Sequence, residues 1–243
     1  GHVLSMWLAK IAGFVTSESV PGDGVHVALP PHWRSVAWAC GTWLAGRSVL
    51  LGSNEEIRTA GLIPELSVAF TPESLYDEAE AQALVPPASL ALRWPEELPA
   101  LVLDGAADLM HYPDRFTPVS TAADSVCLTD LTSEAAAPAA PGAPGGTAPS
   151  GGRLTVLTRA QLAARVEAAD APAGSGRHST SRAVLVRSPD TAQMLQEVLV
   201  AWRTGRTAVV LTPEAGDDVA AAAIRQEDIQ EGITARAGGA QSR

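Results

Sequence analysis

Five histidines and two cysteines are the side chains of this sequence that could bind a metal ion or act as nucleophiles. His2, His111 and His178 have no Cys, Asp or His partner at a spacing typical of metal ligands, so we expect no metal site. Cys40 falls on an apolar stripe and is expected in the core rather than as a nucleophile. No pattern typical of a Ser-His-Asp triad or of a Walker phosphate loop is present.

Other polar and aromatic residues allow two interpretations each. His26 lies among apolar residues, which favours a buried imidazole, whereas His32 at the head of a helix is either a cap residue or a ligand contact. The tryptophans Trp7, Trp33, Trp38, Trp43 and Trp202 either line a ligand pocket or pack in the core. Helical spacing favours the core for most of them, but Trp38 lies off the main stripe and is the least explained. Adjacent acidic residues do not face each other on a helix, so we expect solvated loop or cap residues at Glu55-Glu56, Glu96-Glu97 and Asp217-Asp218.

The composition excludes several classes of protein. The 243-residue chain carries a formal net charge of -10, with 27 acidic and 17 basic residues, and thus lacks the positive surface of a nucleic-acid binder. Hydrophobic residues make up 46% of the chain, which excludes a disordered protein. No apolar stretch approaches the roughly 20 residues of a membrane span, and no secretory signal opens the sequence. Two cysteines cannot form a disulfide framework, so we expect a cytoplasmic protein with no nucleic-acid or membrane partner.

Hydrophobic patterning predicts alternating strands and helices, and therefore parallel βαβ units. Ser5 is expected to cap the first helix, and Gly46 to end a helix that follows Pro30-Pro31. In the first part of the chain we expect strands at 25–29, 49–51, 66–70, 89–92 and 125–128, and a further helix over 72–83.

A segment rich in Ala, Gly and Pro interrupts this pattern at residues 133–152. It has nothing bulky to bury and cannot offset its ordering entropy, so we expect a mobile linker. The predicted organisation is a first α/β lobe over 1–132, the linker over 133–152, a second α/β lobe over 153–235 and a disordered tail over 236–243.

The second lobe repeats the order of the first. A short strand precedes Pro30 and Pro189, and a helix tryptophan follows each proline after 13 residues, at Trp43 and Trp202. Each tryptophan is followed by x-x-Gly-Arg and an apolar strand, with a constant offset of 159 residues between the lobes. This spacing predicts an internal duplication of a helix-strand-helix-strand unit.

A known superfamily shares the order of the first 52 residues. The run from Leu4 to Gly52 comprises a helix, Pro-Gly-Asp-Gly-Val, a strand, Leu-Pro-Pro-His-Trp, a helix ending in Ala-Gly, and a strand. It resembles the opening of the adenylate-forming enzymes, which include acyl-CoA synthetases, AMP-ligases and luciferases. The segments 30–33 and 114–118 resemble in particular a short actinobacterial group of AMP-ligase-like proteins without the C-terminal domain. The resemblance implies an α/β fold of two similar βα lobes, with largely parallel sheets flanked by helices, like the N-terminal subdomains of that superfamily.

The resemblance also implies a chemistry. Members of the superfamily join a carboxylate to the α-phosphate of ATP, and their phosphate loop places glycines, hydroxyls and a lysine around phosphate oxygens. The matching place in this sequence carries Thr129, Thr132, Gly145, Gly146, Thr147 and Arg153, where 145–147 is either linker or the remnant of the loop. Lys10 is the only lysine of the chain, and Asp130 and Glu134 add negative charge there, so we expect an eroded phosphate loop.

Three functional hypotheses follow from this resemblance. The first is a protein that is catalytically inactive by itself and binds, at most weakly, an adenylate or acyl ligand between the lobes, with ATP or AMP and Mg²⁺ as the implied cofactors. Its motivation includes the lack, up to Arg243, of the Tyr-Gly-x-Thr-Glu loop, ribose-binding Asp and catalytic lysine of active relatives. The second is a non-catalytic module that binds a protein partner. The third is an adenylating enzyme completed in trans by a partner chain. No catalytic or metal-ligating residue is assigned.

Overall fold

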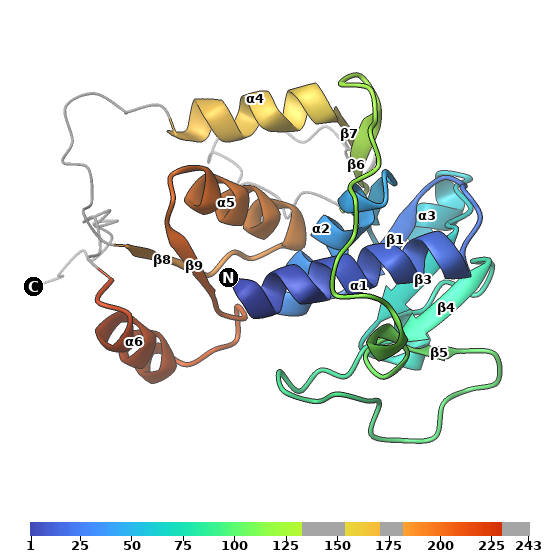
Figure 1. The fold of residues 1–243 in the computed structure, drawn as a ribbon, viewed down its shortest axis with the longest axis horizontal. Coiled ribbons are helices and arrows are strands. Elements are labelled where there is room, and N and C mark those ends of the chain that lie inside the picture. Colours follow the sequence, from blue (N-terminus) through green and yellow to red (C-terminus); the bar gives the residue numbers. More distant parts are fainter. Residues whose placement is uncertain (133–153, 171–181, 230–243) are drawn as a thin grey trace, which may run out of the picture.

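The computed structural model describes residues 1–132, 154–170 and 182–229. Its main feature is a sheet of seven strands in the order β5-β4-β3-β1-β2-β6-β7 (Figure 1). All neighbouring pairs are parallel except β6 and β7, and two further strands, β8 and β9, form a separate parallel pair. The strands are β1 (Val25–Ala28), β2 (Val49–Leu51), β3 (Leu66–Ala69), β4 (Ala81–Leu84), β5 (Leu103–Asp104), β6 (Val126–Asp130), β7 (Thr155–Thr158), β8 (Ala183–Val186) and β9 (Thr207–Val210). This mixed, mostly parallel architecture confirms the expected α/β fold class.

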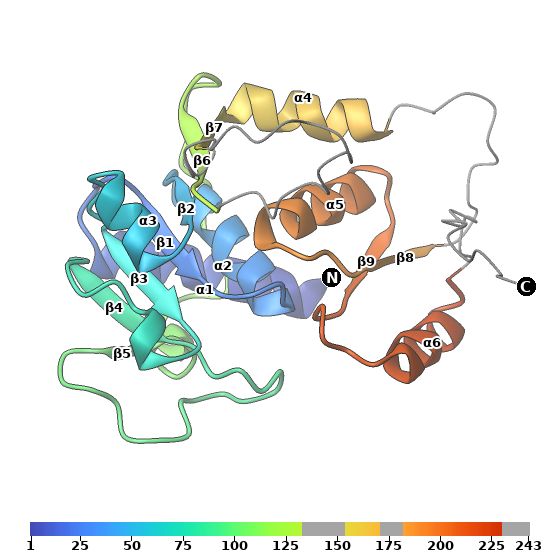
Figure 2. The same cartoon turned by 180° about the vertical axis from the view of Figure 1, so that it is seen from behind.

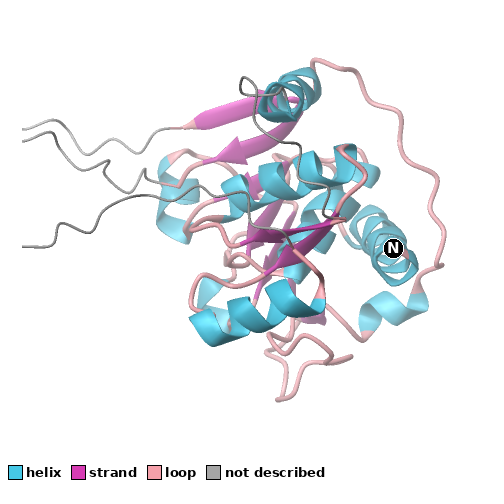
Figure 3. Cartoon of the chain, turned by 90° about the vertical axis from the view of Figure 1, so that its left-hand side faces the viewer, coloured by secondary structure: helices cyan, strands magenta, loops and turns pink. Residues whose placement is uncertain are grey.

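Helices lie on both sides of the large sheet, as Figure 3 shows. The chain moves from β1 to β2 in one direction along the sheet and from β2 past β1 to β3 in the other. Because parallel crossovers are right-handed, these two connections place α2 and α3 on opposite faces. The helices are α1 (His2–Glu18), α2 (Trp33–Leu44), α3 (Asn54–Thr59), α4 (Arg159–Asp170), α5 (Thr191–Arg203) and α6 (Asp217–Gln226), with short 3₁₀ turns at Pro72–Ser74 and Asp108–His111.

The core is centred where α1 crosses α2. Trp38 of α2 is 1% exposed, and its ring meets that of Phe14 edge to face at 5.7 Å. A Cβ added to Gly41 would lie 2.5 Å from the Ile11 side chain, so glycine allows the two helices to approach closely. Trp38 was the tryptophan that helical spacing explained least, yet it is a central core residue.

Elements of the predicted second lobe share this core. Val186, Met194, Leu195 and Val198 of β8 and α5 belong to the same cluster of buried apolar residues as α1 and α2. The Thr191 hydroxyl donates a hydrogen bond of 2.9 Å to the carbonyl oxygen of Leu29, which fixes the start of α5 against the end of β1. Figure 2 shows α5 lying between α4 and the pair β8-β9.

The predicted offset of 159 residues recurs in the strand register. Val25 pairs with Val49, and Val184 pairs with Ala208, so the two parallel pairs match position by position. The ends of α2 and α5 match as well, because Gly46 and Gly205 both take a left-handed conformation, with φ of 78° and 71°. Common descent of the two units stays a prediction, and these matches agree with it.

The region after β3 differs from its expectation. The predicted helix over 72–83 is wrong, since a 3₁₀ turn is followed by bends and a turn over 75–80 and then by β4. The backbone N–H of Tyr76 donates to the Ser67 hydroxyl, and Gln82 donates its side-chain amide to the Tyr76 carbonyl oxygen. Tyr76 is 1% exposed, so long-range burial and strand pairing override local helix propensity here.

Two smaller expectations are also wrong. Residues 89–92 form no strand, because the buried Arg34 side chain donates to their carbonyl oxygens, with hydrogen bonds of 3.4 Å to Ser89 and 2.6 Å to Ala91. The first helix begins at His2, and the Ser5 hydroxyl donates to the His2 carbonyl instead of capping. Gly46 does follow α2 as expected, with Ala45 as the C-cap residue.

The predicted domain division stays a prediction, because the linker and the tail lie outside the described residues. Strand β7 pairs antiparallel with β6, so the first element after the linker segment hydrogen-bonds to the sheet of the first lobe. A capping box starts α4, since the Thr158 hydroxyl accepts from the Gln161 N–H and the Gln161 side chain accepts from the Thr158 N–H.

Candidate functional site

A cleft of about 540 Å³ lies at the carboxyl ends of the parallel strands. The residues after β1 and β2 form its floor, Glu73 and Ser74 follow β3, and Thr132 follows β6. The start of α5, at residues 190–192, forms another wall, so both sets of elements contribute. Open α/β sheets bind ligands at such a place, outside the strand ends where the chain reverses its direction along the sheet. Here that switch point lies between β1 and β3, neighbouring strands whose following connections run in opposite directions.

Three carboxylates line the cleft. Glu55 lies in the first turn of α3, Glu73 in the 3₁₀ turn after β3, and Asp190 at the start of α5. Asp190 is the N-cap of α5, because its Oδ1 accepts a hydrogen bond of 2.7 Å from the Gln193 N–H. Among the residues that the structure describes, no Lys, Arg or His side chain lines this cleft. The cleft therefore disfavours a polyanion such as a triphosphate.

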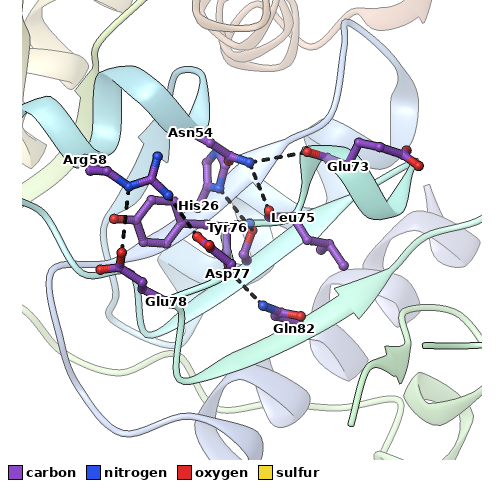
Figure 4. A network of polar contacts seen from close by, with 10 residues as sticks. His26, Asn54, Arg58, Glu73, Leu75, Tyr76, Asp77, Glu78 and Gln82 are labelled. Carbon is purple, nitrogen blue, oxygen red and sulfur yellow. Dashed lines mark hydrogen bonds and ion pairs between the residues drawn. The ribbon is translucent and has the colours of Figure 1, made fainter. Parts of the chain in front are cut away.

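Asn54 contributes an unused acceptor at the edge of this cleft. Its amide donates to the carbonyl oxygens of Leu75 at 2.9 Å and Glu73 at 3.4 Å (Figure 4). The other amide atom, Oδ1, is buried and has no hydrogen-bond partner. The neighbouring Ser53 and Glu56 form a capping box that starts α3 and so positions Asn54. Sequence reasoning missed Asn54, although the Ser-x-x-Glu capping signal marks where α3 begins.

The predicted phosphate-loop residues separate into three groups. Thr132 lines the cleft, and its backbone N–H and hydroxyl both donate to Asp130 Oδ1, at 3.0 and 2.6 Å. Thr129 lies inside β6, 8% exposed between Leu50 and Val156, and does not line the cleft. Gly145, Gly146, Thr147 and Arg153 lie outside the described residues. Phosphate binding by any of the six stays a prediction.

His26 lies beneath the cleft as a structural imidazole. The Ser67 hydroxyl accepts from the Tyr76 N–H at 2.9 Å, which leaves its own proton available to His26 Nδ1 at 3.0 Å. The carbonyl oxygen of Gly52, 3.0 Å from Nε2, can only accept, so Nε2 carries the proton and donates to it. Burial lowers the pKa of His26, which keeps this ring neutral. The expectation of a buried histidine with satisfied hydrogen bonds is confirmed.

His32 is a helix cap. Its Nδ1 accepts a hydrogen bond of 3.2 Å from the Arg34 N–H at the start of α2. Burial, followed by the charge of Arg34, lowers the pKa of His32 to about 4. The Arg34 guanidinium lies 5.2 Å from the Trp7 ring centroid and 4.8 Å from that of Trp33. Of the two interpretations, the structure supports a cap that packs with this cation–π cluster.

Groups suited to nucleophilic or phosphate chemistry lie elsewhere. The one lysine, Lys10, is buried and donates to the Tyr112 carbonyl at 2.6 Å while pairing with Asp114 at 2.7 Å. Burial raises the pKa of the Cys40 thiol to about 12 and also raises that of Cys127. Both thiols are therefore poor nucleophiles.

A metal centre is not visible in the described part of the chain. No group of three or more His, Cys, Asp or Glu side chains there has the arrangement of a metal site. No described helix combines the length and the apolar character that crossing a membrane requires.

Comparisons with known proteins identify the fold. No family model matches the sequence, and no curated protein matches it. Among solved structures, Brucella canis acyl-CoA synthetase is 16% identical, with a TM-score of 0.67 over 92% of this chain and 39% of that chain. Acetoacetyl-CoA synthetase from Streptomyces lividans is 17% identical, with a TM-score of 0.65 over 92% and 35% of the two chains. The anthranilate CoA ligase AuaEII, solved in complex with anthranoyl-AMP, is 12% identical, with a TM-score of 0.65 over 91% and 42%. The chain thus spans about two fifths of the length of these enzymes, and it has the fold of the N-terminal part of adenylate-forming enzymes.

Proposed function

We propose that this chain binds an adenylate or an acyl group weakly in the cleft and does not form acyl-adenylates by itself. The observation that carries this proposal is the charge of the cleft, whose described lining holds three carboxylates and no cation. The fold supports the ligand class, because AuaEII, which shares it, was solved with anthranoyl-AMP.

The described residues do not fit ATP with its triphosphate. Stabilising a pentavalent phosphorus requires cations or N–H donors aimed at the phosphoryl oxygens. Glu55 and Glu73 place carboxylates in the cleft, and Asp130 already uses the N–H and hydroxyl of Thr132. Lys10 lies on α1 and is bound to Tyr112 and Asp114, which lie in the segment after the second 3₁₀ turn. An acyl-adenylate carries one negative charge instead of about four, so its cost in this cleft is smaller.

Calorimetric titration compares the binding of a triphosphate with that of a mimic of the less charged acyl-adenylate. The chain is titrated with ATP and Mg²⁺, and separately with an acyl sulfamoyl adenosine, which replaces the phosphate of an acyl-adenylate. We expect saturable but weak binding of the mimic, weaker binding of ATP, and no pyrophosphate release from ATP and a carboxylic acid. Pyrophosphate release above the protein-free rate would contradict the proposal.

Matched variants identify the site of this binding. Replacing Glu55 and Glu73 by glutamine removes two negative charges from the cleft, so ATP affinity is expected to rise several-fold. The control replaces Asp77 and Glu78, an acidic pair that contacts Arg58 outside the cleft, and should leave ATP affinity unchanged. If both double variants respond equally, ATP does not bind in this cleft. Arg153→Ala additionally tests whether the phosphate-loop position contributes, and no heat with either ligand would direct attention to protein partners.

A further inference from the structure

A second cavity, of about 360 Å³, lies at the opposite end of the strands from the cleft. Trp43 and Cys127 form one side, and they lie just before β2 and at the start of β6. Arg159, which follows the end of the antiparallel β7 next to Val126, lies at the same level. The cavity is therefore separate from the carboxyl-end cleft.

Two helices supply the walls of this cavity. Arg159, Leu162, Ala163 and Val166 of α4 line it, and their spacing of three and four residues places them on one face of the helix. Leu199 and Arg203 of α5 line the other side, again four residues apart. The arrangement is an apolar chamber with one guanidinium on each helix.

Trp43 offers only its apolar surface to this chamber. Its indole N–H already donates a hydrogen bond of 2.7 Å to the Cys127 carbonyl oxygen. Cys127 is 1% exposed, and its thiol lies 3.5 Å from the Leu157 carbonyl oxygen. Neither the Trp43 indole N–H nor the Cys127 thiol is therefore available to hydrogen-bond a polar ligand. The body of a bound molecule would therefore meet apolar walls.

The two arginines differ in whether the guanidinium is paired with a carboxylate. Arg203 pairs with Glu167 at 3.1 Å across α4 and α5. Within the described chain, Arg159 has no carboxylate partner, and its guanidinium makes one hydrogen bond, a long one of 3.5 Å to the Arg47 carbonyl oxygen. Its Nε is buried without a partner. The chamber thus has one unused guanidinium, in a protein whose formal net charge is -10.

We propose that this chamber binds an amphipathic monocarboxylate, with the apolar body against Trp43 and α4 and the carboxylate on Arg159. Guanidinium and carboxylate form charge-assisted, bidentate hydrogen bonds, and burial of the apolar body adds to the affinity. One spare positive charge matches a monoanion better than a dianionic phosphate ester. Cavities of this volume accommodate small ligands. The proposal is independent of nucleotide binding in the cleft.

The probes are octanoate, octanol and octyl phosphate. They share one apolar tail and differ in the polar head group. Binding is measured by calorimetry and by tryptophan fluorescence, compared between the natural chain and Trp43→Phe. We expect saturable binding of octanoate, weaker binding of octyl phosphate and the weakest of octanol. Arg159→Gln should weaken octanoate at least about tenfold while leaving octanol within twofold. The matched control Arg58→Gln removes an arginine on α3 and should change neither.

A second variant separates this site from unspecific adsorption. Ala163 is exposed at the mouth of the chamber, so Ala163→Trp is expected to fill the space without disturbing the core and to abolish octanoate binding. Equal binding of octanoate and octanol would overturn the inference that the carboxylate binds to Arg159. Binding that survives Ala163→Trp, or the absence of octanoate binding to the natural chain, would overturn the site itself.

Discussion

The order helix, strand, helix, strand occurs twice in this molecule, with the same register and different burial. In the first occurrence β1 lies between β2 and β3, and its central residues are at most 2% exposed. In the second, β8 pairs within the described chain only with β9, which has no buried residue. The first occurrence is thus the centre of a large sheet, and the second is a smaller unit on its side.

The side chains at corresponding positions explain this difference. At the offset of 159 residues, Trp38 of α2 corresponds to Glu197 of α5, which accepts hydrogen bonds from Ser188 and Gln193. In the preceding helices, Phe14 is fully buried in α1, whereas Val166 is the one buried side chain among those described in α4. Turn residues and strand alternation therefore set the order and the register, while the volume of a few side chains sets how much is buried.

The largest test of this comparison concerns Trp38 and Glu197. We expect Trp38→Ala to lower the free energy of unfolding by about 3–5 kcal/mol, because it leaves a cavity beside Phe14. Glu197→Ala removes a partly exposed carboxylate and should cost less than about 1 kcal/mol. Urea denaturation followed by circular dichroism measures both. Similar losses would mean that the two units bury comparable cores.

A smaller difference is expected between the two repeated tryptophans. Trp43→Phe removes the indole N–H and leaves the buried Cys127 carbonyl without that donor, at a cost of about 1–3 kcal/mol. Trp202 makes no such bond within the described residues, so Trp202→Phe should cost less than about 1 kcal/mol. Both side chains are partly buried and pack against the main core, as their helical spacing favours. Equal losses of unfolding free energy would show that the Trp43 hydrogen bond contributes nothing.

Much of the first unit could be predicted from sequence because its signals are local. The strands near 25–29, 49–51 and 66–70 follow from short β-branched and apolar runs, and the helix over 33–44 follows from one apolar stripe ended by glycine. The segment 72–83 could not be predicted, because its helix-forming residues are held by partners from other strands. Local propensity has no access to such pairings.

The candidate cleft was predictable only in its location. The resemblance to the phosphate loop of adenylate-forming enzymes led to Thr132, and the structure places this residue at the cleft. The carboxylates of Glu55, Glu73 and Asp190 come from three connections far apart in the sequence, so no spacing rule joins them. Asn54 gains its role only through carbonyl groups beyond β3.

Acid is expected to destabilise the first unit more than the second. The pKa of His32 falls to about 4 in the folded state, and that of His26 is also lowered, both chiefly by burial. The unfolded chain binds these protons near pH 6.5, so stability is complete above that pH and decreases as the pH falls toward 4. The positions 159 residues later hold Leu185 and Thr191, which do not titrate.

His32→Asn isolates one of these contributions, because asparagine can still cap α2. Relative to the natural chain, the variant should lose about 1–3 kcal/mol less unfolding free energy between pH 7 and pH 4. Urea midpoints measured at several pH values give this difference. Amide exchange should show the acid effect in β1 before β8, and a pH response identical to that of the natural chain would contradict the role of His32.

The smallest expected effect separates an ion pair between α4 and α5 of the second unit from one between α1 and the segment after the second 3₁₀ turn in the first. Glu167 and Arg203 are 57% and 47% exposed, so water and salt screen their pairing, and Glu167→Gln should cost no more than about 0.5 kcal/mol. Lys10 is 11% exposed beside Asp114, so Asp114→Asn removes the carboxylate charge paired with a buried ammonium and should cost about 1–2 kcal/mol. Raising the salt concentration should reduce the first loss more than the second. If Glu167→Gln costs as much as Asp114→Asn, the second unit depends on its charged surface to the degree that the first depends on its buried lysine.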